Sequence, residues 1–150
     1  MTEFEKISKE RLERNSFMLY NHIKVESIER DRAVFRMEIR PENRNPFGQA
    51  HGGALYTLAD NAAGGATHTD GRLYVTQTST MHYMGNQKDG VLRAAAYVRH
   101  RGRSTCLTIV DITGEGGKLL ATGEFTFFRV DRPLMEKPEL NEDGTPAENG

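Results

Sequence analysis

The segment Gln49–Gly53 precedes a stretch with helical apolar spacing and contains none of the residues that usually begin a helix. Helices commonly start at Ser, Thr, Asp or Asn, whose side chains accept hydrogen bonds from the first backbone N–H groups. Without such a cap these N–H groups are available to a ligand oxygen, and Gly52 and Gly53 let a ligand approach the backbone. The segment therefore predicts a site for an oxyanion or a polarised carbonyl. The alternative is that both glycines only allow close packing between the helix and a strand.

Asp60 is the only carboxylate between Asn45 and Thr69. It follows Gly53 by about two helical turns, so the two residues share a face of the predicted helix. Tyr56 belongs to the same face, which lies away from the apolar stripe. A single carboxylate beside a carbonyl site is a candidate general base, whereas the ordinary alternative is a solvent-exposed helix face.

The elements predicted around these residues form an α+β arrangement of two strands, one long helix and four further strands. Strands are predicted at 22–26, 35–40, 73–83, 91–99, 106–112 and 119–130, and helices at 2–14 and 51–67. Short polar turns between the last four strands favour an antiparallel meander. The long helix is rich in Ala and Gly, which predicts a sheet wrapped closely around it.

The chain of 150 residues has the length of one domain, and its net charge of −1 argues against a non-specific nucleic-acid-binding protein. A single cysteine, Cys106, excludes an intramolecular disulfide and is predicted to be a buried thiol. The histidines lack the spacing of a metal site. The charged start and the absence of a long apolar run predict a cytoplasmic protein without a membrane segment. One domain is expected over 1–131, with an N-terminal helix within 1–15 and a flexible acidic tail over 132–150.

Asn45, Gly48 and His51-Gly52-Gly53, followed by Leu58-Ala59-Asp60, resemble the motif of PaaI-like acyl-CoA thioesterases. The resemblance extends over residues 16–130 and implies the hot-dog fold, a curved antiparallel sheet wrapped around one central helix. It also implies hydrolysis of an acyl-CoA or acyl-carrier-protein thioester, without a cofactor other than the CoA of the substrate. Homodimers or pairs of dimers are expected, with active sites at the subunit interface.

The resemblance assigns catalytic roles to four residues. Asp60 is implied as the general base or nucleophile, and the Gly52 N–H as the donor to the thioester carbonyl. Asn45 would bind substrate or water from the same subunit as Gly52, while Asp60 comes from the other subunit. Thr76 occupies a hydroxyl position that assists the water.

Further residues are predicted to bind the substrate. Those near the helix start are Phe47, Gly48, His51, Gly53 and Tyr56. The basic run 99–104 supplies Arg101, Arg103 and Ser104, which the resemblance implies near the CoA nucleotide. The alternatives are core packing for the aromatic residues and a solvated hairpin turn for the basic run. A non-catalytic acyl-CoA-binding protein is the alternative function.

Overall fold

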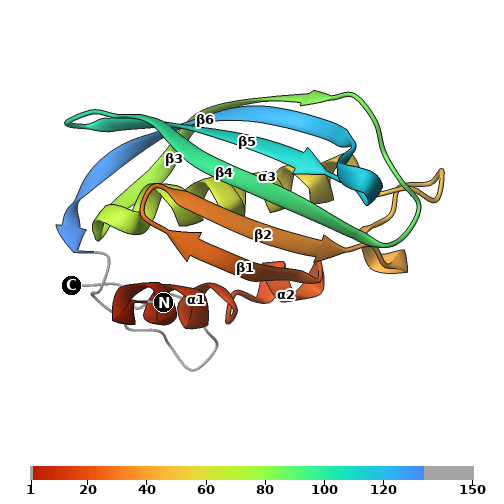
Figure 1. Cartoon of the computed structure of the whole chain (residues 1–150), viewed down its shortest axis with the longest axis horizontal. Coiled ribbons are helices and arrows are strands. Elements are labelled where there is room, and N and C mark those ends of the chain that lie inside the picture. Colours follow the sequence, from red (N-terminus) through yellow and green to blue (C-terminus); the bar gives the residue numbers. More distant parts are fainter. Residues whose placement is uncertain (1, 134–150) are drawn as a thin grey trace, which may run out of the picture.

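The computed structural model describes residues 2–133, arranged as six strands and three α-helices (Figure 1). The helices are α1 (Glu3–Leu12), α2 (Ser16–Tyr20) and α3 (Gly52–Thr67), with short 3-10 turns at Pro41–Asn43, His68–Asp70 and Glu115–Gly117. The strands are β1 (Ile23–Glu29), β2 (Arg32–Glu38), β3 (Arg72–Tyr83), β4 (Val91–Arg101), β5 (Thr105–Thr113) and β6 (Leu119–Pro133). Each predicted strand and helix is present in the structure. The structure also contains α2, which was not predicted from the sequence.

The six strands form one antiparallel sheet in the order β1-β2-β4-β5-β6-β3. The expected meander is therefore correct for β4, β5 and β6 but wrong for β3. Instead of pairing with β4, β3 pairs with β6 at the far edge of the sheet. The segment 84–90 then returns the chain to β4, which lies beside β2. As a result, β3 has a hydrogen-bonded neighbour on only one side among residues 2–133.

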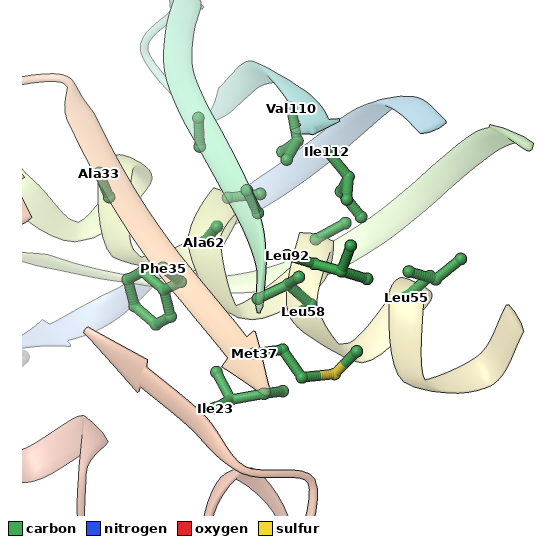
Figure 2. Packing of buried hydrophobic residues seen from close by; sticks show 14 of the residues in the cluster. Ile23, Ala33, Phe35, Met37, Leu55, Leu58, Ala62, Leu92, Val110 and Ile112 are labelled. Carbon is green, nitrogen blue, oxygen red and sulfur yellow. The ribbon is translucent and has the colours of Figure 1, made fainter. Parts of the chain in front are cut away.

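The core lies between this sheet and the buried face of α3 (Figure 2). Leu55 and Leu58 of α3 belong to the same buried cluster as Phe35 of β2 and Leu92 of β4, and Leu58 lies beside Leu92. Gly65 explains how closely helix and sheet approach, because a Cβ atom there would lie 2.8 Å from the Phe35 ring. The small residues of α3 thus serve the close packing that the composition predicted.

The N-terminal helices cover the β1 edge of the sheet (Figure 1). Thr2 and Glu5 form the expected capping box of α1, in which each side chain accepts from the other's backbone N–H. Asn15 caps α2 by accepting from the backbone N–H groups of Phe17 and Met18. No helix in the described part of the chain is long and apolar enough to cross a membrane. Residues 134–150 of the predicted tail lie outside the described residues.

Candidate active site

Asp60 lies midway along α3 on the face that the core leaves uncovered. Its carboxylate accepts a hydrogen bond of 3.0 Å from the Thr76 hydroxyl of β3. The pairing register of β3 with β6 shifts between Thr76 and Thr78, and such a bulge changes the direction of nearby side chains. Burial raises the pKa of Asp60 above its ordinary value, and the Thr76 hydrogen bond partly opposes this rise. Asp60 and Thr76, which were predicted separately, are therefore in direct contact.

The start of α3 differs in one respect from the prediction. His51 is the N-cap residue, and its Nδ1 atom accepts the Gly53 N–H at 2.9 Å. The expectation of an uncapped first turn was therefore wrong for Gly53, because a histidine ring nitrogen can accept as a Ser or Asp oxygen does. The Gly52 N–H has no acceptor within residues 2–133. Gly52 is thus the backbone donor that this helix end offers to a ligand.

The loop before α3 is folded around Asn45. Its Oδ1 atom accepts the N–H groups of Phe47 and Gln49 at 2.9 and 3.1 Å. Gly48 adopts a φ of 77°, a left-handed conformation that glycine adopts without strain. The Asn45 NH2 group has no acceptor in the described chain, so it is a free donor. Phe47 is 85% exposed, which leaves its ring available to another molecule.

Two tyrosines flank the first turns of α3. Tyr83 at the end of β3 donates its hydroxyl to the Gly52 carbonyl oxygen at 3.3 Å. The ring of Tyr56 packs edge-on against buried Phe125, with 5.7 Å between ring centroids. Tyr83 was considered only as a candidate acyl-pocket residue, and its contact with Gly52 was not predicted, because no local pattern relates the end of a strand to a helix start 31 residues earlier.

The basic run lies at the opposite end of α3. Arg101 donates to the Thr67 carbonyl oxygen and forms ion pairs with Asp31 and Asp70 at 2.8 and 3.0 Å. This guanidinium ties the end of α3 to two loops, so the structure favours a stabilising role over the predicted phosphate contact. Arg103 and Ser104 are exposed on the β4–β5 hairpin. The end of α3 that Arg101 contacts at Thr67 lies about 22 Å along the helix axis from Gly52 of the same chain.

A cavity of about 290 Å³ begins one helical turn beyond Asp60. Gly64 and His68 of α3 form one wall, and Leu12 of α1 and Leu73 of β3 contribute apolar surface. A Cβ atom on Gly64 would have no neighbour closer than 3.9 Å. Gly64 therefore keeps this cavity open on the same helical face as Asp60.

Metal ligands do not converge in the described part of the chain: no group of three His, Cys, Asp or Glu side chains is placed to hold an ion. Cys106 is fully buried, as predicted. The uncovered face of α3, together with Thr76 of β3, therefore offers a carboxylate, a hydroxyl and a backbone donor.

The model of the family described as "Thioesterase superfamily" matches residues 47–121. A 1,4-dihydroxy-2-naphthoyl-CoA hydrolase from Listeria monocytogenes is 32% identical over 108 residues, which cover 69% of this chain and 87% of the relative. The chain belongs to the thioesterase superfamily. The acyl-coenzyme A thioesterase PaaI of Escherichia coli is 30% identical over 100 residues, covering 66% of this chain and 71% of PaaI.

Solved structures of this superfamily confirm the hot-dog fold. The E. coli PaaI structure has a TM-score of 0.79 and 26% identity, covering 83% of this chain and 91% of PaaI. A hypothetical thioesterase protein from Streptococcus pneumoniae, solved with coenzyme A, has a TM-score of 0.75 and 29% identity over 81% of this chain and 95% of its own. Two further structures carry the same streptococcal name. In one an aspartate is replaced by alanine, and in the other a threonine sixteen positions later is replaced by alanine.

Proposed function

We propose that this chain hydrolyses an acyl-CoA thioester to free CoA and a carboxylic acid, with Asp60 as its catalytic carboxylate. The observation that carries this proposal is the hydrogen bond between Asp60 and Thr76 on the uncovered face of α3. These residues are sixteen positions apart, the same spacing as the aspartate and threonine replaced in the streptococcal thioesterase. The thioesterase names of its relatives and the coenzyme A in the streptococcal structure support the substrate class.

The proposed chemistry needs four groups and no cofactor besides the CoA of the substrate. A thioester carbonyl is more electrophilic than an amide carbonyl, and the Gly52 N–H would stabilise the negative charge that develops on its oxygen. Asp60 would remove a proton from the attacking water and pass it to the CoA thiolate as the C–S bond breaks. Alternatively, Asp60 would attack the carbonyl carbon and displace the CoA thiolate, which takes a proton from solvent, to form an anhydride that water then hydrolyses. The Thr76 hydroxyl favours the ionised carboxylate that either route requires. The free Asn45 NH2 group would bind the water or the carbonyl.

One chain does not bring Gly52 and Asp60 close enough to serve one carbonyl. The two residues are eight positions apart in α3, which corresponds to about 12 Å along the helix axis. We therefore propose a homodimer in which Gly52 of one subunit meets Asp60 of the other. The free edge of β3 is a suitable pairing surface, because an edge strand presents unpaired N–H and C=O groups. Val75 on this strand is 49% exposed in the single chain.

The substrate would extend in two directions from the thioester. The acyl group would enter the cavity beside Gly64, whose apolar surface comes from Leu12 and Leu73. The CoA nucleotide would lie near Arg103 and Ser104 of the β4–β5 hairpin, where a guanidinium can pair with phosphate.

Thiol release from short, medium, long and aryl acyl-CoAs tests this proposal. Asp60→Asn should lower kcat by about 10²–10⁴-fold without loss of folding by circular dichroism. Asp89→Asn, at an exposed carboxylate in the 84–90 segment, is the matched control and should retain activity. A wild type that binds acyl-CoAs but releases no thiol would contradict the proposal and favour a non-catalytic acyl-CoA-binding protein.

A further inference from the structure

Tyr83 connects the end of β3 to the first turn of α3. Its hydroxyl donates to the Gly52 carbonyl oxygen at 3.3 Å, and its ring lies 4.0 Å from the position that a Gly52 Cβ atom would occupy. Burial and nearby Tyr56 raise the pKa of Tyr83, and a phenol is a donor at neutral pH even at its ordinary pKa. Half of the side chain is exposed, so the core does not explain its position.

The peptide group between Gly52 and Gly53 is held at both ends by side chains. Tyr83 binds its carbonyl oxygen, and His51 Nδ1 binds its N–H at 2.9 Å. Two consecutive glycines at a helix end have wide conformational freedom, and helix ends commonly fray. The two side chains therefore restrict the one turn from which the Gly52 N–H projects.

We propose that Tyr83 is a positioning residue, which holds the first turn of α3 so that the Gly52 N–H meets the thioester carbonyl in the transition state. This inference rests on the proposed thioesterase function. A donor to a developing oxyanion is effective when it is already in place before the reaction, because no energy is then spent on reorganisation. His51 holds the N–H side of the same peptide group, and Tyr83 holds its carbonyl side.

The kinetic test replaces Tyr83 by Phe, which removes the hydroxyl and retains the ring. Loss of one neutral hydrogen bond predicts a decrease in kcat of about 2- to 10-fold, with KM unchanged, because the affected donor acts mainly in the transition state. The control is Tyr97→Phe, at a partly exposed tyrosine in β4. This substitution should leave kcat and KM unchanged. An unchanged kcat, or an increase in KM alone, would overturn the proposal.

A second readout does not depend on activity. In ¹⁵N-labelled protein, Tyr83→Phe should accelerate hydrogen exchange of the Gly53 amide, which His51 Nδ1 accepts, by a similar factor, while amides in the middle of α3 keep their rates. Unchanged exchange at Gly53 would show that Tyr83 does not hold the turn and would refute its role. If the wild type hydrolyses no acyl-CoA, the proposed function fails, and the exchange rates still decide whether Tyr83 holds this turn.

Discussion

Two inactive variants of this chain are expected to restore activity when they form a mixed dimer. Gly52→Pro removes the proposed donor N–H, and Asp60→Asn removes the proposed catalytic carboxylate. Proline suits the first position of a helix, and His51 before it is already extended, with φ −66° and ψ 135°. Gly52→Pro therefore deletes the donor without a steric reason for the helix to change.

Because Gly52 and Asp60 lie about 12 Å apart along α3, each site takes one group from each subunit, and this sets the size of the expected recovery. Loss of an oxyanion donor costs about 10²–10³-fold in kcat, and loss of a general base about 10²–10⁴-fold. In a heterodimer of the two variants, one interface site combines intact Gly52 with intact Asp60, and the other site lacks both. Purified heterodimer should therefore have about half the wild-type activity per dimer of two sites.

The assay uses two affinity tags, co-expression, tandem purification of the heterodimer and measurement of thiol release. The matched control pairs a wild-type chain with a chain that carries both substitutions. That heterodimer contains the same two changes, but each of its interface sites lacks one group, so it should be nearly inactive. If this control keeps half the activity while the first heterodimer stays inactive, the two groups act within one chain, and the reasoning from helix length is wrong.

Three further predictions concern stability and pH. Gly65→Ala should be less stable than Gly64→Ala by about 1–3 kcal/mol in urea denaturation, because only Gly65 faces the buried Phe35 ring and the helix-propensity gain is common to both. Asp60→Asn should raise the free energy of unfolding at pH 7: because the folded-state pKa is raised, the destabilisation by Asp60 grows between the unfolded-state and folded-state pKa and is complete above the latter, and the gain should vanish in acid. Thr76→Val should move the acid limb of the kcat/KM profile to higher pH, because it removes the bond that lowers the Asp60 pKa, whereas Thr76→Ser should leave the limb in place.

The elements of the fold were largely predictable because their signals are local. Alternation in β2 and the small residues of α3 follow directly from burial on one face. The five residues of α2 span little more than one helical turn, so the apolar spacing does not repeat and gave no signal. The pairing of β3 with β6 depends on contacts between distant segments, and local turn chemistry favoured the simpler meander.

The candidate site was predictable to the extent that it lies on one helix. Asp60 stood out because its neighbours are uncharged, and Gly52 because of its position at a helix start. The Arg101 ion pairs depend on how the segments around Asp31 and Asp70 meet in the fold, whereas the family resemblance implied a CoA phosphate as the partner of this guanidinium. The same limit applies to Tyr83, whose contact with Gly52 exists only once β3 lies beside α3.

The proposed site makes the register of the dimer a determinant of catalysis. In a two-fold dimer through β3, the two α3 helices run in opposite directions, so the offset between strands decides whether Gly52 meets Asp60 of the other subunit. A slip of two residues along the strand would move the subunits by roughly 7 Å, more than twice the length of a hydrogen bond. The irregularity between Thr76 and Thr78 in β3 lies beside Asp60. Because it interrupts the regular strand at one place, the registers in which β3 could pair with β3 of the other subunit are not equivalent. Substitutions at Gln77, which the register shift between Thr76 and Thr78 leaves unpaired, should therefore alter kcat without touching the substrate, because they alter how two intact half-sites meet.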